Sequence, residues 1–301
     1  MSQVQQVTKV SVVISTYKRD EALMRALESL VAQSYRGFEV VLVDDSAEAQ
    51  WQQKVKEIAA SFEERLDLTI ITNPENLGSA ATRNKGIAAA SGEYITFLDD
   101  DDIYLPEKIE KQLADMEASG ADYGLTDLYL YNENEEIAEK RERRYILSTD
   151  PQELFRYHLL YHMTGTDTFM FKTEYLRKIG GFPPINVWDE FYLMKEAILA
   201  GGKCCYSPHC YVKAYIHTGE AGGLSSGQGK IDGENSLHEE KKKYFSRLPK
   251  KDVRHIKARH YAVIAFAHLR MKQYPAFCAN AIRAVLISPA KSLSIIKDRR
   301  Q

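Results

Sequence analysis

Acidic side chains gather at one point of this 301-residue chain, where the apolar run Glu93–Leu98 ends in four aspartates, Asp99–Asp102. Four neighbouring carboxylates repel one another, and a bound cation would offset that cost. Mg²⁺ and Mn²⁺ prefer oxygen ligands and bind one or two carboxylates together with the phosphates of a substrate. The run therefore predicts a site for a divalent cation and a diphosphate; a solvated acidic turn is the alternative.

Polar residues suited to nucleotide binding follow two other apolar runs. Tyr17 can stack on a planar base, and the neighbouring cations Lys18 and Arg19 can meet phosphate. Asp45 can accept hydrogen bonds from a base or a ribose. Taken singly, the first feature also fits a surface turn and the second a helix cap.

A third group opens a small-residue helix. Gly78 can bring the backbone close to a ligand, and a helix N-terminus favours anions. Arg83 lies about one helical turn further along. The stretch contains neither GxGxxG nor a Walker lysine pattern, so the usual dinucleotide and P-loop sites are disfavoured.

Strand-like and helix-like segments alternate over the first hundred residues and must position these groups. The apolar β-branched runs are Lys9–Ile14, Phe38–Val43, Leu68–Thr72 and Glu93–Leu98. The helical patterns between them follow Asp20, cover Trp51–Phe62 and cover Gly78–Ala90. This order predicts a parallel sheet covered by helices. Ligands bind outside the carboxyl ends of such strands, so the polar groups should converge on one crevice.

The pattern changes after Pro106. We expect helices over about Pro106–Ala118, 151–163 and Asp189–Ala200, strands over Tyr123–Tyr131 and Thr168–Lys172, and a charged hairpin or loop over Asn132–Arg144. The stretch Gly219–Gly233 is rich in Gly and Ser, which favours a lid or a linker. Helical patterns then cover 236–247, 252–274 and 276–297.

Composition narrows the class of protein. The hydrophobic fraction of 44% and the charged fraction of 27% exclude a disordered or low-complexity chain. The four cysteines lack the spacing of a zinc site or a disulfide framework, which fits a cytosolic protein. The N-terminus lacks a signal-peptide pattern, and the apolar stretch Tyr261–Leu269 is too short for a membrane helix.

The net charge of −2 conceals an asymmetry. Residues 239–301 carry 16 basic and 4 acidic side chains. This basic end predicts contact with something anionic. An anionic membrane and a homodimer are the two candidates that remain open. Nucleic acid is not expected, because no RNP signature, zinc finger or helix-turn-helix accompanies the charge.

Six segments, taken in order, carry a family resemblance: VSVVISTYKR, VVLVDDS, NPENLGSAATRNKG, GEYITFLDDDDIYLPEKI, IGGF and WDEFYLMKEAILAGGK. Together they span roughly residues 8–220, and the chain resembles a family 2 glycosyltransferase. The resemblance implies the α/β GT-A fold, with a mostly parallel central sheet flanked by helices, and the helical patterns beyond it predict a C-terminal helical appendage. We therefore expect a GT-A domain, 1–235, with its nucleotide-sugar half ending near 105, and a basic helical extension, 236–301.

The resemblance also implies residue roles on the nucleotide side. Ser15 and Tyr17 match positions that contact the nucleotide, and Asp45 matches the aspartate that recognises the base. Arg83 falls in the stretch that closes over the nucleotide, and Asp100 joins this group.

The remaining roles concern the metal and the chemistry. Asp101 is common to both alignments of the acidic run and is the first position for Mn²⁺ or Mg²⁺. His217 resembles a late histidine that meets metal or diphosphate, although a surface histidine would look the same. Asp189 matches the catalytic base, and Trp188 stands before it where relatives usually have Glu.

The expected activity is metal-dependent transfer of a sugar, with inversion, from a nucleoside-diphosphate sugar to an acceptor hydroxyl. UDP is the family-level expectation for the donor. The acceptor stays open among a polysaccharide, a lipid-linked saccharide and a teichoic-type polymer, as does peripheral contact with the inner face of the cell membrane. The alternatives are a nucleotidyltransferase, whose glycine-rich loop ISTYKR lacks, and an inactive sugar-nucleotide or nucleic-acid binder.

Overall fold

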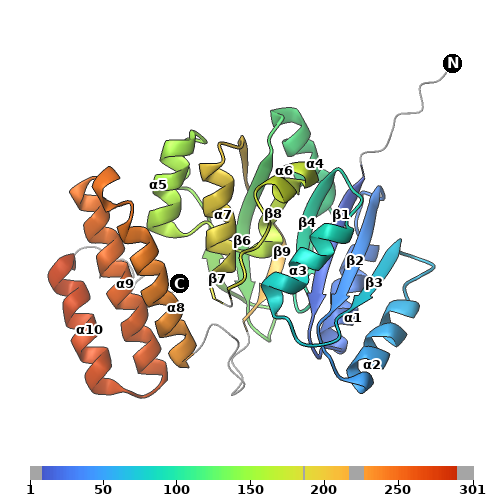
Figure 1. Ribbon diagram of the computed structural model, residues 1–301, viewed down its shortest axis with the longest axis horizontal. Coiled ribbons are helices and arrows are strands. Elements are labelled where there is room, and N and C mark those ends of the chain that lie inside the picture. The colour runs from blue at the N-terminus through green and yellow to red at the C-terminus, as the bar shows by residue number, and fades with distance from the viewer. Residues whose placement is uncertain (1–8, 186, 217–226, 290–301) are drawn as a thin grey trace.

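The structure is a computed structural model that describes residues 9–185, 187–216 and 227–289 (Figure 1). Within these residues nine strands form one sheet. The strands are β1 (Val10–Thr16), β2 (Phe38–Asp44), β3 (Leu68–Thr72), β4 (Tyr94–Asp99), β5 (Ile103–Tyr104), β6 (Tyr123–Tyr131), β7 (Ile137–Arg141), β8 (Phe169–Lys172) and β9 (Cys204–Tyr215). The α-helices are α1 (Glu21–Val31), α2 (Ala49–Ala60), α3 (Ser79–Ala89), α4 (Lys108–Ser119), α5 (Pro151–Tyr161), α6 (Thr173–Lys178), α7 (Asp189–Leu199), α8 (Gly227–Lys242), α9 (Lys250–Arg270) and α10 (Tyr274–Ile287). Two 3₁₀ turns, η1 (Thr166–Thr168) and η2 (Phe245–Arg247), complete the set.

The sheet has the order β3-β2-β1-β4-β8-β6-β9-β5, with β7 paired to β6. Strands β1 to β4, β6 and β9 run in one direction, and β5, β7 and β8 run in the other. The expected mostly parallel sheet is therefore confirmed, with the antiparallel pairs confined to its second half. The first half is the helix-alternating unit that the chain's pattern predicts.

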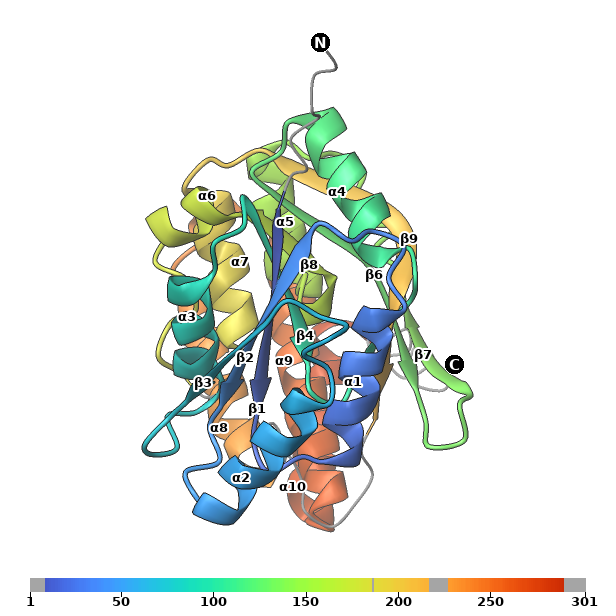
Figure 2. The same ribbon diagram turned by 90° about the vertical axis from the view of Figure 1, so that its right-hand side faces the viewer.

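Helices cover both faces of the sheet (Figure 2). Along β1, Val10, Val12 and Ile14 pack into one buried cluster with α1, α2 and α4. Val13 points the other way, into a second cluster with α3 and α5 to α7. Burial on both faces explains why these strands read as continuous apolar runs. Asp20 accepts a hydrogen bond from the backbone N–H of Glu21, so the expected cap of α1 is confirmed.

Two elements differ from the sequence-based expectation. Strand β9 was not expected, because Pro208 and polar residues interrupt its apolar pattern. Shifts of register against β6 around Asp127 absorb that interruption. Residues 227–233, expected in a lid or linker, instead form the first turns of α8, where Ile231 is buried. The rest of that stretch, 217–226, lies outside the described residues.

The C-terminal helices pack against the sheet domain rather than extending from it (Figure 1). Leu159, Leu160 and Phe191 of α5 and α7 share a buried cluster with Leu237 of α8 and Ile256 of α9. The division expected between 235 and 236 falls inside α8. Among the described residues, no helix combines the length and apolar character needed to cross a bilayer.

Candidate active site

The carboxyl ends of the parallel strands meet at one edge of the sheet. In the register of the sheet, Thr16 lies opposite Asp44 and Ser15 lies opposite Asp99. The backbone N–H of Asp45 donates to the Thr16 carbonyl at 2.9 Å. The expected convergence of polar groups from separate strands is therefore confirmed.

The turn after β1 contacts the acidic corner, Asp99–Asp102. The backbone N–H of Tyr17 donates to Asp100 Oδ2 at 3.2 Å, and Arg19 Nη2 donates to Asp101 Oδ2 at 2.8 Å. Burial and the Asp101 charge raise the pKa of Asp100 to about 7. Tyr17 is 46% exposed, so its ring is open to stack on a planar group.

Asp45 organises the turn that precedes α3. Its Oδ1 accepts from Asn73 Nδ2 and from the backbone N–H of Leu77, each at 2.8 Å. Its Oδ2 accepts from the backbone N–H of Gly78 at 2.9 Å, where φ is +80°. Glycine tolerates that conformation without strain. A carboxylate oxygen can accept more than one hydrogen bond, so these contacts leave Asp45 with capacity to bind a base. Recognition of a base by Asp45 remains a prediction.

Arg83 of α3 joins the acidic corner to the start of α7. Its Nη2 donates to Asp99 Oδ1 at 2.6 Å, and its Nη1 donates to Asp189 Oδ2 at 3.2 Å. The guanidinium also lies 5.3 Å from the centroid of the Phe182 ring. Burial lowers the pKa of Arg83, but Asp99 and Asp189 outweigh it and raise the pKa above its usual value.

Asp189 is a buried carboxylate at the first position of α7. Burial raises its pKa to about 6, although Arg83 opposes the shift. The preceding residue, Trp188, has φ of +70° and turns the chain into the helix. A carboxylate with a pKa near neutrality, next to a cluster of charges, has the properties of a general base.

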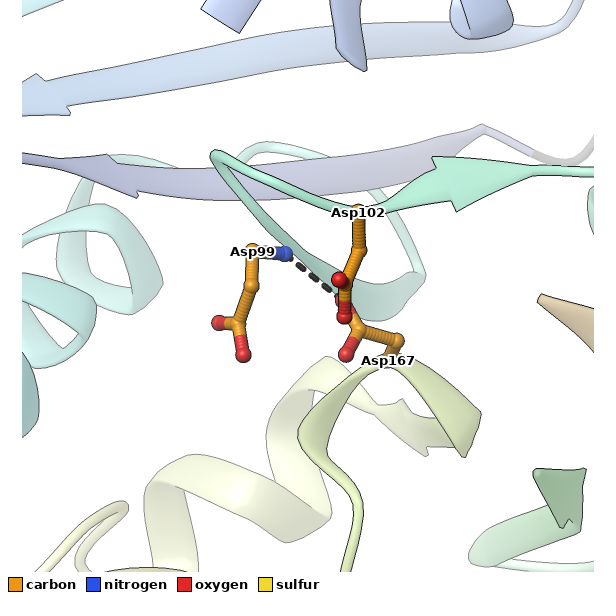
Figure 3. A group of neighbouring side chains, drawn as sticks. All are labelled: Asp99, Asp102 and Asp167. Carbon is orange, nitrogen blue, oxygen red and sulfur yellow. Dashed lines mark hydrogen bonds between the residues drawn. The ribbon is translucent and has the colours of Figure 1, made fainter. Parts of the chain in front are cut away.

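A second carboxylate arrangement is built on Asp167 of η1. One oxygen from each of Asp99, Asp102 and Asp167 lies within 4.8 Å of the others (Figure 3). The Asp99 backbone N–H donates to Asp167 Oδ1 at 2.6 Å. Burial and Asp99 raise the pKa of Asp167 to about 8, and burial and Asp167 raise that of Asp102. Crowded carboxylate oxygens are a fitting donor set for Mg²⁺ or Mn²⁺.

Comparison with known proteins identifies the family. Residues 11–180, more than half of the chain, match the family described as Glycosyl transferase family 2. The chain belongs to this family. The match is to a glycosyltransferase family, which disfavours the nucleotidyltransferase alternative.

Its curated relatives are similar over part of their length. An uncharacterized glycosyltransferase of Methanocaldococcus jannaschii is 32% identical over 174 residues, which cover 56% of this chain and 58% of the relative. The uncharacterized glycosyltransferase YwdF of Bacillus subtilis is 31% identical, covering 62% and 67%. The amylovoran biosynthesis glycosyltransferase AmsB of Erwinia amylovora is 39% identical, covering 35% and 34%.

Solved structures establish the GT-A-like fold of this glycosyltransferase. S. aureus TarS 1-349, in complex with UDP-GlcNAc, superimposes with a TM-score of 0.61 at 18% identity, covering 92% of this chain and 91% of that one. The mannosyltransferase PcManGT from Pyrobaculum calidifontis, in complex with GDP-Man and Mn²⁺, gives 0.60 at 18% identity, covering 97% and 80%.

Sequence reasoning missed two residues of the site, Asp167 and Glu190. Glu190 Oε2 accepts from the backbone N–H of Gly165 at 2.9 Å, and its Oε1 accepts from Thr166 Oγ1 at 2.6 Å. Glu190 thereby fixes the turn that carries Asp167. The one available signal is the polar run Thr164–Thr168 directly before an apolar strand.

The structure places most of the predicted residues at one edge of the sheet, through different contacts. Asp99, Arg83 and Asp189 are joined by direct ion pairs, and Tyr17 and Asp100 are joined by a hydrogen bond. Ser15 and Asp45 reach the same edge through strand register and through the turn before α3. His217 lies outside the described residues, and metal binding by Asp101 remains a prediction.

Proposed function

We propose that this glycosyltransferase moves a sugar from a UDP-sugar to an acceptor hydroxyl with inversion at the anomeric carbon. One observation carries the proposal: Arg83 ties the acidic corner at Asp99 to Asp189, a buried carboxylate with a raised pKa. Arg83 thus contacts both the acidic corner, where we expect the diphosphate, and the carboxylate that we propose as the base. UDP is the expected base by family resemblance, and one structural neighbour was solved with UDP-GlcNAc.

Asp189 would take the proton from the attacking hydroxyl. With a pKa of about 6, this carboxylate is mostly ionised near neutral pH and can still accept a proton. A single base opposite the leaving group corresponds to one in-line displacement and hence to inversion. A retaining mechanism would need a second carboxylate as nucleophile close to the first.

The chain's own cations and carboxylates would handle the diphosphate. Arg19 and Arg83 both reach the acidic corner, where a nucleoside diphosphate would sit. We propose Asp101 as the first ligand of Mn²⁺ or Mg²⁺, because its side chain is 18% exposed whereas Asp102 and Asp167 are buried. When bound, a divalent ion would supply Lewis-acid stabilisation of the leaving group. The group Asp99, Asp102 and Asp167 is the alternative set of ligands.

The acceptor is proposed to be a saccharide in polysaccharide synthesis. The relative AmsB is named for amylovoran biosynthesis, and this is the support for the class. The deciding experiment incubates the full-length protein and Mn²⁺ with a panel of nucleotide sugars and measures donor hydrolysis. Hydrolysis of one donor, lost with EDTA, is the expected result. No hydrolysis of any donor, with nucleotide still bound, would make the chain an inactive sugar-nucleotide binder.

We also propose that α10 contacts an anionic membrane surface. Tyr274, Ile282, Val285 and Leu286 are exposed apolar side chains on this helix. From 250 to 287 the chain carries eight basic residues and one acidic residue. Exposed apolar side chains beside basic ones favour anionic bilayers. Helix α10 itself carries one basic residue, Arg283, and no acidic one, and the other basic residues lie on α9 and in the turn before α10; a homodimer through α10 is the alternative.

A further inference from the structure

A cluster of cations lies where α8 and α9 meet the start of α7. Its centre is His162, the residue that follows α5. Arg259 of α9 places Nη1 3.0 Å from His162 Nδ1 and 2.8 Å from Nε2. Lys241 of α8 contacts the same Nε2 with its ammonium. We call His162, Lys241 and Arg259 the cation cluster.

The cation cluster has more hydrogen-bond donors than acceptors. Lys241 is 3% exposed, and burial together with the Arg259 charge lowers its pKa. Burial also lowers the pKa of His162, so the ring is neutral and offers one acceptor nitrogen to an ammonium and a guanidinium. Within the described ranges, neither Lys241 nor Arg259 forms an ion pair with a carboxylate. Buried cations without such partners are costly to a fold.

One acidic residue, Glu234, influences these cations without pairing with them. Its charge opposes the lowering of the pKa of both Lys241 and Arg259. Its Oε1 lies 3.6 Å from His260 Nδ1, and its buried Oε2 has no hydrogen-bond partner in the described part of the chain. Lys241 and Arg259 thus share the influence of a single carboxylate, that of Glu234.

Trp188, which precedes the proposed base Asp189, adds an indole N–H to this group of hydrogen-bond donors. Its ring meets His162 edge-on, with centroids 5.1 Å apart, and its buried Nε1–H has no acceptor among the residues that the structure describes. The Lys230 ammonium lies 3.7 Å from the centroid of the Trp188 indole. Trp188 directly precedes Asp189, and both Trp188 and Arg259 are partly exposed. An anion bound here would therefore contact the residue that directly precedes the proposed base in the chain.

We propose that the cation cluster and Trp188 form an oxyanion subsite for the acceptor, which carries a phosphate or diphosphate group. This inference rests on the proposed function, because it names the chemistry of the acceptor that Asp189 would deprotonate. Phosphate fits better than a single carboxylate because its several oxygens can accept from an ammonium, a guanidinium and an indole at once. The subsite is distinct from the acidic corner, which reaches Asp189 through Arg83.

The first test needs no acceptor. Full-length protein is titrated with inorganic phosphate and with pyrophosphate, at constant ionic strength set by chloride, and binding is followed by calorimetry and by the thermal midpoint. Wild type should bind, and Lys241→Met should bind about tenfold more weakly or worse, because a charge-assisted donor is lost. Lys242→Met is the matched control, since Lys242 is the next residue of α8, is exposed and pairs with Glu239.

Stability separates a binding role from a structural one. Removing a buried cation without an ion-pair partner should leave the thermal midpoint of Lys241→Met equal to or above that of wild type, and phosphate should no longer raise it. A fall in the midpoint would make Lys241 a structural clamp and overturn the proposal. If Lys241→Met does not fold, Arg259→Lys replaces it. That variant keeps the charge but loses the paired N–H donors of the guanidinium. Unchanged phosphate binding in it would also overturn the proposal.

The second test identifies the source of the phosphate. Phosphorylated and dephosphorylated forms of one saccharide acceptor are compared in the transferase assay. The phosphorylated form should have a KM about tenfold lower, and Lys241→Met should remove most of that difference. Phosphate binding with no preference between the acceptors would assign the subsite to free phosphate and reject the acceptor role. Failure of wild-type donor hydrolysis would instead reject the proposed function, while the phosphate titration still judges the subsite.

Discussion

Two opposing influences act on the Asp189 carboxylate. Burial disfavours its charge and Arg83 favours it, and the balance raises its pKa to about 6. Asp189→Asn removes the proton acceptor but keeps the size of the side chain. Turnover should fall by about 10²–10⁴-fold, while UDP affinity measured by calorimetry stays within about twofold. Glu196→Gln, on the exposed part of the same helix, should match wild type; full activity in Asp189→Asn would remove Asp189 from the mechanism.

The same carboxylate sets a pH dependence. As a base, Asp189 works only when ionised, so activity should rise as pH increases through about 6 and level off above pH about 7. The measurement is kcat/KM between pH 5 and 8, because this ratio reports the free enzyme. A profile that is flat across this range would show that no group with this pKa acts as the base.

Two carboxylate arrangements compete for the divalent ion. If Asp101 is the main ligand, Asp101→Asn should abolish the gain in UDP affinity that Mn²⁺ produces. Asp167→Asn should then keep most of it, because Asp167 fixes the Asp99 backbone. Calorimetry of UDP with Mn²⁺ or with EDTA measures both variants. The reverse pattern would assign the ion to Asp99, Asp102 and Asp167.

At the scale of elements, Asn84 connects α3 to the turn before α7. Its Nδ2 donates to the Phe182 carbonyl at 2.7 Å, and its Oδ1 accepts from the Phe182 backbone N–H at 2.9 Å. Asn84→Ala leaves both backbone groups unpaired and should cost about 2–3 kcal/mol of unfolding free energy by urea titration. It should also lower turnover, because Arg83 is the adjacent residue of α3. Asn280→Ala, which removes one bond within α10, serves as the control; equal losses in the two variants would reject the connection.

Elements with one dominant local signal could be predicted from the sequence. The β-branched runs became β1, β2 and β4 because these strands are buried on both faces, which requires apolar residues throughout, whereas β3 is a partly exposed edge strand. The acidic corner and Asp45 could be placed together because parallel strands end at a common edge. Asp189 could be singled out only through the family resemblance, because its spacing alone does not connect it with Arg83.

Features that depend on long-range contacts could not be predicted. Strand β9 contains Pro208, and only pairing with β6 through a shifted register makes it a strand. The first two turns of helix α8 contain the glycines Gly227, Gly229 and Gly233, which disfavour a helix. Burial of Ile231 and Leu237 outweighs this effect. Asp167 sits in a short polar run whose position is set by Glu190 from another helix.

At the scale of the whole molecule, the excess of basic side chains lies in the helical region at the C-terminal end of the described chain. The basic helices α8 to α10 are anchored to the sheet domain by apolar packing and by ion pairs such as Arg156–Asp252 at 2.6 Å and Lys195–Glu240 at 2.9 Å. The anchored side contributes Lys241 and Arg259 to the cation cluster around His162. The outer helix, α10, keeps its apolar side chains exposed. The appendage thus places basic side chains against the sheet domain and an apolar surface on its outer helix.

Membrane binding by α10 can be tested at one of its exposed leucines. Leu286 is 77% exposed on α10, and Leu147 is 84% exposed on a loop of the sheet domain, which makes it a matched control. Wild type should pellet with vesicles that contain anionic lipid, and salt should weaken the binding. Leu286→Gln should bind at least about tenfold more weakly because a buried leucine contributes about 1.5–3 kcal/mol, whereas Leu147→Gln should bind as wild type does. A wild-type protein that is dimeric in light scattering and ignores vesicles at every salt concentration would assign the α10 surface to a second copy of the chain.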